Sequence, residues 1–185
     1  MPSRKTPFRL IKNFSATQYC WMLLLLFALA MEVCGLHFQY DLHLPVCVNC
    51  VYERAFFLGF LLAALVGLLN PKALCARMFA SLLLLLWSGL GLRTAIEHYL
   101  SSNPGTSSFG QTCPLAANFP DWLKLDQWVP FMFNPAGGAC MPLPWELLGF
   151  SMPAWLIAIF SCGLAAALLI IISQFINTKE DSIDK

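Results

Sequence analysis

The segment Cys47-Val48-Asn49-Cys50 lies between two apolar runs, at about 17–36 and 51–69, that are each long enough to cross a lipid bilayer. A C-x-x-C pair can close into a disulfide, and the charges around it set its reactivity. Most such pairs belong to soluble redox domains or to metal sites. The position between two apolar runs instead predicts redox chemistry at a membrane surface.

Four apolar runs fill most of the 185-residue chain. A spanning helix needs about 20 mainly apolar residues, and these runs lie at about 17–36, 51–69, 76–95 and 154–173. They are rich in Leu and Ala and do not alternate, so they predict helices rather than a β-barrel. With 58% hydrophobic and 11% charged residues, the composition excludes a soluble domain. We expect an all-α membrane protein, in which residues 1–185 form one integral membrane domain, a four-transmembrane-helix bundle.

Lys and Arg predict how the bundle lies in the membrane, because cytoplasmic loops carry an excess of them. The loops at about 37–50 and 96–153 hold only Lys124. The two tails and the turn between the second and third spans carry most of the remaining basic residues, Arg4, Lys5, Arg9, Lys12, Lys72, Arg77, Lys179 and Lys185. We therefore expect a multi-pass protein of the bacterial inner membrane with both termini in the cytoplasm and both loops in the periplasm.

The first apolar run has an alternative interpretation as a signal peptide. A basic segment precedes it, and Ala28-Leu29-Ala30 resembles a cleavage site. The run continues past Ala30 toward Leu36, however, and an uncleaved helix completes an even bundle. We therefore expect the helix to be retained, and cleavage would still leave both redox loops on one side.

The long loop contains one segment with helical character, at 119–130. Proline lies near each of its ends, and Trp122, Leu125 and Val129 share a helical face. Such a stretch can form a short interfacial helix, with Trp at the depth of the lipid headgroups. A surface turn packed on the bundle is the alternative. A loop of this length is usually functional or disordered, and two cysteines within it favour function.

Topology divides the eight cysteines into two groups. Four lie within spans or at the cytoplasmic turn, where Cys often behaves as a small apolar residue: Cys20, Cys34, Cys75 and Cys162. The other four are expected in the periplasm, as a tight pair and a long-range pair: Cys47, Cys50, Cys113 and Cys140. The long-range pair could be a structural disulfide. The tight pair could be half of a zinc site, but a complete site needs further ligands, and no second C-x-x-C supplies them, so no metal is expected.

The start of the second span predicts a stabilised thiolate. If the helix begins near Asn49, that side chain could cap it, and Cys50 would lie at its positive end. This position lowers the pKa of a thiol and favours the thiolate. Arg54 lies one helical turn after Cys50 and can stabilise a thiolate or an anionic ligand oxygen. Snorkelling of Arg54 to the headgroups is the alternative.

The outer end of the third span adds Arg93, Glu97 and His98. His98 could donate a hydrogen bond or a proton to a bound ring, or it could lie solvated at the interface. Glu32, which is unusual inside a span, could pair with Arg54 or Arg93 or lie near the headgroups. A disulfide that oxidises a soluble dithiol must itself be re-oxidised, and no haem or flavin motif is evident. By elimination, a lipid-soluble quinone at the outer edge of the bundle is the expected acceptor.

This set of residues resembles the DsbB family, whose members form disulfide bonds. The resemblance covers nearly the whole chain and rests on Pro45, the segment 47–54, Glu97-His98, Cys113, the segment 119–130 and Cys140. It implies a quinone-dependent protein dithiol oxidase that re-oxidises a DsbA-type periplasmic thiol oxidant, as in the DsbA–DsbB–quinone system. The implied cofactor is ubiquinone or menaquinone. The implied partners are the DsbA-type protein, the membrane quinone pool and the lipid bilayer, without nucleic acid.

The resemblance also implies a role for each residue of the site. A reduced partner would attack the Cys113–Cys140 disulfide at Cys113, after which Cys140 would attack Cys47 and release Cys50 as a thiolate beside the quinone. Attack on the quinone ring then re-forms the Cys47–Cys50 disulfide and yields quinol. The expected cofactor-binding residues are Arg54, which would orient the quinone, His98 and Glu97.

Two alternatives remain open. A DsbB paralogue would serve a different thioredoxin-like partner. A non-catalytic membrane protein would carry structural disulfides or a metal site. Replacement of Cys50 by Ser separates the enzyme from this last class, because only the enzyme loses its activity.

Overall fold

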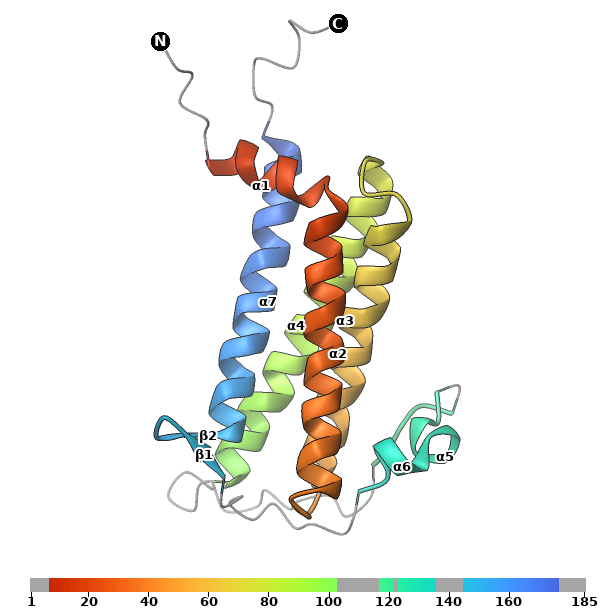
Figure 1. Cartoon of the computed structure of the whole chain (residues 1–185), viewed down its shortest axis with the longest axis vertical. Helices are drawn as coiled ribbons and strands as arrows, with labels where there is room; N and C mark the ends of the chain where they lie inside the picture. Colours follow the sequence, from red (N-terminus) through yellow and green to blue (C-terminus); the bar gives the residue numbers. More distant parts are fainter. Residues whose placement is uncertain (1–6, 103–116, 122, 136–144, 177–185) are drawn as a thin grey trace, which may run out of the picture.

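The computed structural model describes residues 7–102, 117–121, 123–135 and 145–176. These residues form α1 (Pro7–Ser15), α2 (Gln18–Tyr40), α3 (Val48–Leu69), α4 (Leu74–Ser102), α5 (Leu125–Trp128), α6 (Pro130–Phe133), β1 (Glu146–Leu147), β2 (Phe150–Ser151) and α7 (Met152–Phe175). The helices α2, α3, α4 and α7 are long and apolar enough to cross a membrane, and they stand side by side as a bundle (Figure 1). The expected all-α, four-helix membrane fold is confirmed.

Short connections join α2 to α3 and α3 to α4, whereas the long outer loop joins α4 to α7. α3 ends before Asn70-Pro71, and Pro153 occupies the first turn of α7, where its missing N–H removes no helical hydrogen bond. α4 has 29 residues, which corresponds to about 44 Å and exceeds the apolar thickness of a bilayer, about 30 Å. Its last turns extend past the predicted end at about 95 and carry His98.

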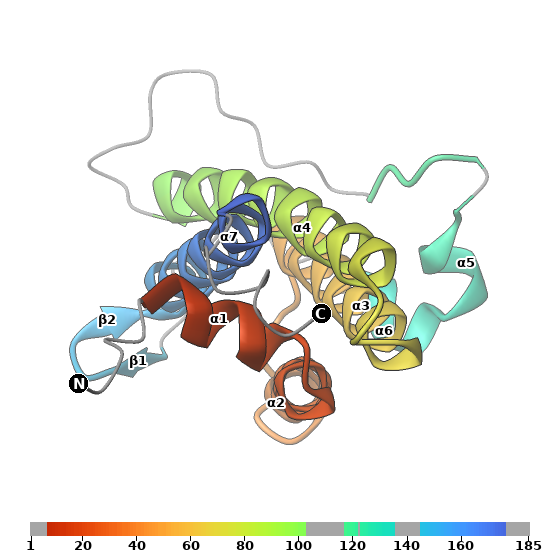
Figure 2. The same ribbon diagram turned by 90° about the horizontal axis from the view of Figure 1, so that it is seen from above.

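The four helices do not contact one another equally. α3 packs on α2 and α4, and α4 packs on α7, whereas α2 and α7 touch at most marginally. At one end of the bundle α1 crosses from α2 to α7 and packs on both (Figure 2). The backbones of α2 and α7 therefore do not pack closely on each other.

Aromatic rings pack against one another and against glycines in the interior of the bundle. The Phe57 and Phe160 rings stack with their centroids 5.0 Å apart, and Phe60 meets Phe160 edge-to-face at 5.8 Å. Glycines give such rings room: Gly91 faces the Phe160 ring, and Gly67 faces the Trp21 ring. Small residues of this kind let helices approach closely inside a membrane, where lipid leaves little hydrophobic drive for association.

Gly67→Ala is expected to destabilise the bundle. Its Cβ would overlap the ring of Trp21, which is 1% exposed and donates its indole N–H to the Ser15 carbonyl at 3.0 Å. Overpacking of this kind costs about 1–3 kcal/mol. Gly89→Ala is the matched control, because its Cβ would meet only Leu164, at an ordinary 3.9 Å. Thermal unfolding of the detergent-solubilised variants measures both, and equal stability would contradict this packing.

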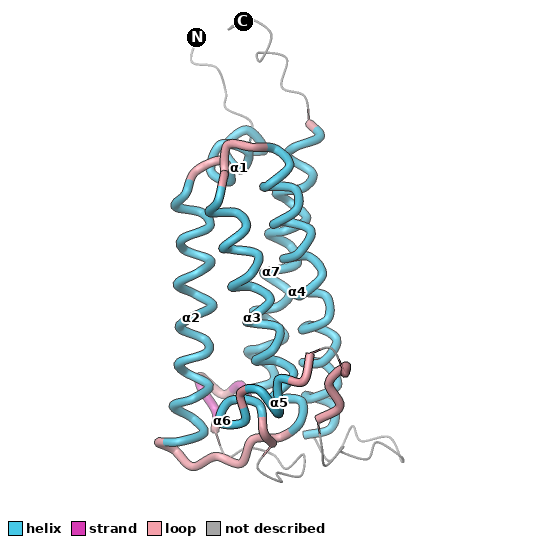
Figure 3. Tube along the Cα trace, turned by 90° about the vertical axis from the view of Figure 1, so that its right-hand side faces the viewer, coloured by secondary structure: helices cyan, strands magenta, loops and turns pink. Residues whose placement is uncertain are grey.

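One end of the bundle, the thiol end, holds the start of α3 and the ends of α2 and α4. Figure 3 shows α5 and α6 beside this end. The segment 119–130 was expected to form one helix, but α5 and α6 are separate, because the backbone of Val129 is not helical before Pro130. Phe133 is 1% exposed and packs near Val51. Phe119, Leu125 and Val129 of the segment pack against the same cluster, so the segment lies on the bundle.

Candidate functional site

Cys47 caps α3 at the thiol end. Its sulfur accepts a hydrogen bond from the backbone N–H of Cys50 at 3.2 Å, as the side-chain oxygen of Ser or Asp does at other helix starts. The expectation that Asn49 caps this helix is wrong, because the helix already begins at Val48. The positive end of the helix therefore stabilises the sulfur of Cys47, and not that of Cys50 as predicted.

Two buried polar side chains, His98 and Glu53, form a chain of contacts that starts at the Cys47 sulfur. Nε2 of His98, on α4, lies 3.5 Å from the sulfur, and Nδ1 of His98 lies 3.0 Å from Oε1 of Glu53, on α3. His98 is 2% exposed and Glu53 is 3% exposed. When the Glu53 carboxylate accepts the Nδ1 hydrogen, Nε2 can take the thiol proton and hold it beside the sulfur. A thiol, an imidazole and a carboxylate in this order are typical of an activated nucleophile.

The surroundings of Cys47 favour its thiolate. A hydrogen bond from the Cys50 thiol, followed by a hydrogen bond and positive charge from His98, lowers the pKa of Cys47 to about 4, against the opposing effect of burial. The thiolate is the form that attacks a disulfide, and a thiol of low pKa also leaves a disulfide readily. Cys47 is therefore prepared for thiol–disulfide exchange.

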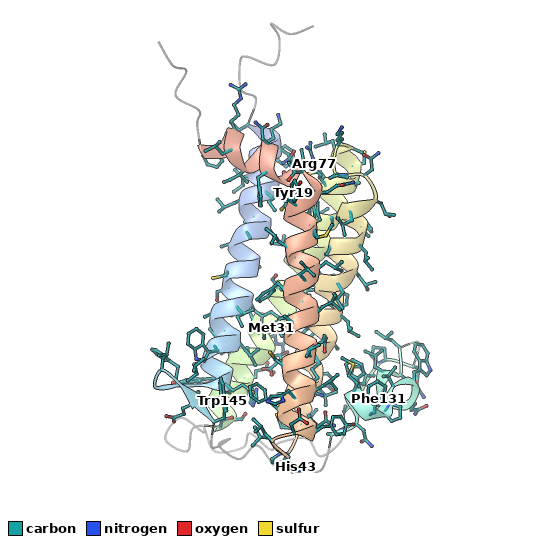
Figure 4. The ribbon with its side chains drawn as sticks, in the orientation of Figure 1. Tyr19, Met31, His43, Arg77, Phe131 and Trp145 are labelled. Atoms are coloured by element: carbon teal, nitrogen blue, oxygen red, sulfur yellow. The ribbon has the colours of Figure 1, made fainter. Side chains whose placement is uncertain are left out.

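Cys50 and Arg54, one turn apart on α3, line a cavity of about 90 Å³. It lies between α2, α3 and α7, on the side where α2 and α7 hardly touch. Figure 4 shows Met31 of α2 on this side of the bundle. Most of the lining is apolar and includes Met31, Phe38, Leu44, Phe57, Met152 and Leu156.

Arg54 is held by neutral acceptors from two elements. Nη1 donates to Oε1 of Gln39, on α2, at 2.5 Å and to the Met132 carbonyl, on α6, at 3.0 Å. Nη2 donates to the Gly35 carbonyl of α2. The side chain is only 7% exposed, so Arg54 is fixed inside the bundle and does not snorkel. A charge kept at this depth indicates a functional position.

Three other predicted polar residues lie elsewhere. Glu97 does not line the cavity and accepts a hydrogen bond from the exposed Arg93 at 3.0 Å. His98 is also absent from the lining and lies against the Cys47 sulfur. Glu32 is 5% exposed, and neither carboxylate oxygen has a hydrogen-bond partner among the described residues. Neither of the ion pairs that the sequence suggested for Glu32 is therefore formed.

Cys113 and Cys140 lie outside the described residues, as does Trp122. Within the loop that joins the two cysteines, the described residues are fixed to the thiol end. The Tyr52 hydroxyl of α3 accepts a hydrogen bond from the backbone N–H of Asn118 at 2.7 Å. The long loop is thus anchored beside the start of α3.

Comparison with known proteins identifies the family. Residues 17–170 match the family described as disulfide bond formation protein DsbB. A protein named disulfide bond formation protein B from Vibrio parahaemolyticus is 41% identical over 175 residues, which cover 94% of this chain and 96% of the relative. Proteins of the same name from Aliivibrio fischeri and Haemophilus influenzae are each 39% identical, over 91% and 92% of this chain and 98% and 95% of the relatives. This chain belongs to the DsbB family.

Membership of the DsbB family gives the arrangement a biological setting. The chain is a multi-pass membrane protein with a redox role in disulfide bond formation. Cys47 and Cys50 are free thiols in this structure.

The site of this DsbB-family chain also contains three side chains that could bind a metal ion. The ligand atoms of Cys47, Cys50 and His98 all lie within 4.8 Å of one another. A structural zinc site needs four ligands, and the carboxylate of Glu53 is bonded to His98 instead. Because both thiols would be ligands, a bound metal would exclude the Cys47–Cys50 disulfide.

Three residues of the site were not predicted from the sequence: Glu53, Gln39 and Cys34. Glu53 follows Cys50 by three residues and shares its helical face, a signal that could have identified it. Gln39 and Cys34 line the cavity from α2, and no local pattern indicates that they face the start of α3.

Proposed function

We propose that this protein is a quinone-dependent dithiol oxidase of the bacterial inner membrane, which re-oxidises a DsbA-type periplasmic thiol oxidant. One observation carries the proposal: Cys50, the neighbour of the activated Cys47 thiol, lines an apolar cavity together with Arg54. The thiol end faces the periplasm in this proposal, because the opposite end carries the basic residues Lys72 and Arg77.

The chemistry of the residues that line the cavity suits a quinone. Apolar walls suit a ring and its hydrocarbon substituents, and a few polar groups suffice to orient a ligand. Arg54 bonds acceptors among the described residues through three N–H groups out of the five of a guanidinium, so it can also donate to a ring oxygen. In this proposal a lipid-soluble molecule enters the cavity from the bilayer between α2 and α7, whose residues line it. When bound, a quinone accepts two electrons and two protons and becomes quinol.

Thiol–disulfide exchange carries the electrons to this cavity. The thiolate of the reduced partner attacks Cys113 of the Cys113–Cys140 disulfide, and Cys140 leaves as a thiolate. Cys140 then attacks Cys47 of the Cys47–Cys50 disulfide. Cys50 leaves as a thiolate, which lies in the cavity beside the positive charge of Arg54.

The last exchange uses the stabilised thiolate of Cys47. The second thiol of the partner then attacks its mixed disulfide with Cys113, so the partner departs as a disulfide and Cys113 leaves as a thiolate. This thiolate attacks Cys140 of the Cys140–Cys47 disulfide, re-forms the loop disulfide and releases Cys47. Because its pKa is low, Cys47 leaves readily, and the His98 imidazole stabilises the released thiolate. Cys47 and Cys50 then join again as a disulfide, and their two electrons pass to the acceptor.

Coupling to the acceptor makes this cycle favourable. A DsbA-type partner has a reduction potential of about −120 mV, whereas structural disulfides have reduction potentials below roughly −300 mV. For two electrons this difference corresponds to about 8 kcal/mol against oxidation of the partner. An isolated structural disulfide could not perform the reaction, so an electron acceptor beside the pair is part of the function.

Arg54→Ala tests the assignment of the cavity. Loss of a charge-assisted hydrogen bond costs about 1.5–3 kcal/mol, so the KM for a soluble quinone is expected to rise about 10- to 150-fold. The KM for the reduced partner should change far less, because the partner attacks Cys113, before the electrons reach the Cys50 and Arg54 side chains. Arg93→Ala is the matched control, since Arg93 is exposed and pairs only with Glu97 within the described residues. An unchanged quinone KM in Arg54→Ala would contradict the proposed site.

A non-catalytic metal protein is the second candidate, favoured by the cluster of Cys47, Cys50 and His98. That function predicts about one zinc ion per chain after purification without chelators. Metal analysis of protein that reduces quinone decides between the two candidates, because active, metal-free protein excludes the metal function. If the protein instead oxidises a different thioredoxin-like partner, as a DsbB paralogue would, the chemistry of the site is the same.

A further inference from the structure

The Gln39 side chain joins the cavity to the outer loop. Its Oε1 accepts a hydrogen bond from Arg54 Nη1 at 2.5 Å, and its Nε2 donates to the Phe131 carbonyl of α6 at 3.3 Å. Gln39 and Arg54 both line the cavity. One amide group therefore contacts the positive charge of the cavity with one end and the loop with the other.

Further bonds hold α6 at the same point. Tyr40 donates its hydroxyl hydrogen to the Phe131 carbonyl at 2.7 Å, and Arg54 Nη1 donates to the Met132 carbonyl at 3.0 Å. Phe133 is 1% exposed and belongs to an apolar cluster at the start of α3. Figure 4 shows Phe131 at the thiol end of the bundle. We call the position of α6 on the bundle, fixed by the bonds of Gln39, Tyr40 and Arg54 to Phe131 and Met132, its seat. The hydrogen bonds that hold α6 in this seat are also among those that position Arg54.

Departure of α6 from this seat would release Arg54. Both hydrogens of its Nη1 are bonded in the seated state, one to Gln39 and one to Met132. Without α6, Arg54 loses the Met132 carbonyl, and Gln39 loses the contact that fixes its other end. A long side chain that regains rotamer freedom must lose it again when it binds a ligand. Seated α6 therefore preorganises Arg54 for a ligand in the cavity.

We propose that Gln39 is a positioning residue that couples the seating of α6 to the binding of the electron acceptor beside Arg54. This coupling presupposes the proposed oxidase function and adds a regulation of the same site. Because coupling between two sites is reciprocal, a bound acceptor also holds α6 more firmly. α6 lies between Cys113 and Cys140 in the sequence, so the acceptor changes how the loop with the exchanging cysteines is held.

Steady-state kinetics with a soluble short-chain quinone test the coupling. Gln39→Leu removes both bonds of the amide, and its quinone KM is expected to rise about tenfold or more. Tyr40→Phe removes a bond to α6 at a residue that does not line the cavity, and we expect a rise of about two- to fivefold. In both variants kcat at saturating quinone should stay close to native. Tyr19→Phe is the matched control, because Tyr19 is 77% exposed and lies at the end of the bundle opposite the thiol end (Figure 4).

Hydrogen exchange of α6 gives a second readout. The amides of Phe133 and Asn134 bond to the carbonyls of Val129 and Pro130. Added quinone is expected to slow their exchange in the native protein by about the factor by which loss of the seat raises the quinone KM, since the coupling is reciprocal. This quinone-dependent protection should vanish in Gln39→Leu.

The outcomes separate the coupling from the oxidase function. A native quinone KM in Tyr40→Phe, together with α6 exchange that quinone does not alter, overturns the coupling while native turnover supports the oxidase. A raised KM in Gln39→Leu alone, again without an effect of quinone on α6, also overturns it. Absence of quinone reduction by the native protein would overturn the oxidase function and the coupling together.

Discussion

With Cys50 replaced by serine, the purified protein is expected to lose quinone reduction entirely and still fold. A hydroxyl group cannot close the Cys47–Cys50 disulfide, so no electrons reach the cavity and the rate falls to the uncatalysed background. The backbone N–H that bonds the Cys47 sulfur is kept, so the start of α3 should persist. Quinone absorbance during reaction with a reduced thioredoxin-like protein measures the loss.

Cys75→Ser provides the matched control for this experiment. Cys75 is an exposed free thiol in the first turn of α4, far along that helix from the thiol end, and its replacement should leave turnover native. Substantial turnover in folded Cys50→Ser protein would show that electrons leave by another route, and it would contradict the assignment of Cys50.

Replacement of His98 by alanine is expected to raise the pKa of Cys47 in the reduced protein. In the native protein the hydrogen bond from Cys50 and the contact with His98 lower this pKa to about 4, so the thiolate persists at neutral pH and is lost only as the pH falls through about 4. Without His98 the pKa moves toward the ordinary thiol value, about 8.5. The thiolate is then lost at a higher pH, and its amount at a given lower pH falls about tenfold for each unit gained. Ultraviolet absorbance of the thiolate against pH measures the change.

His37→Ala is the control for this titration. His37 is exposed near the end of α2 and pairs with Asp41 at 2.5 Å, so its loss should not alter the Cys47 curve. In His98→Ala, Cys47 is also a poorer leaving group, and single-turnover exchange should slow with it. Identical titration curves for the native protein and His98→Ala would contradict the thiol–imidazole–carboxylate arrangement.

The four spans were predictable because a bilayer imposes a length and a polarity on each helix. The residues at which the helices end were less predictable. α4 continues past 95 to Ser102, since polar residues such as Glu97 end an apolar run without ending a helix. α1 (Pro7–Ser15) was missed, because a nine-residue helix is too short to span and its basic residues indicate only orientation. The β1–β2 hairpin was missed as well, since two-residue strands leave no periodic pattern.

The site could be predicted from the sequence only where spacing along one helix determines it. The proximity of Cys50 and Arg54 follows from helical periodicity. The choice between Cys47 and Cys50 as the stabilised thiol depends on a shift of one or two residues in the helix start, which patterns do not fix. The bond between His98 and Glu53 joins residues 45 apart in the sequence, a tertiary contact that no local signal encodes. The roles of Cys113 and Cys140 stay predictions from the family resemblance.

A single turnover in the absence of oxygen tests the electron route most directly. Fully reduced protein with Cys113→Ser and Cys140→Ser, in which the loop pair cannot take over the new disulfide, is mixed with one equivalent of soluble quinone. Quinol is measured by absorbance, and the cysteine pairs are mapped by mass spectrometry. Because a disulfide and a quinol each account for two electrons, we predict one quinol for each Cys47–Cys50 disulfide formed. Quinol that appears without this disulfide, or this disulfide formed without quinol, would contradict transfer from the Cys47–Cys50 pair to an acceptor in the Arg54 cavity.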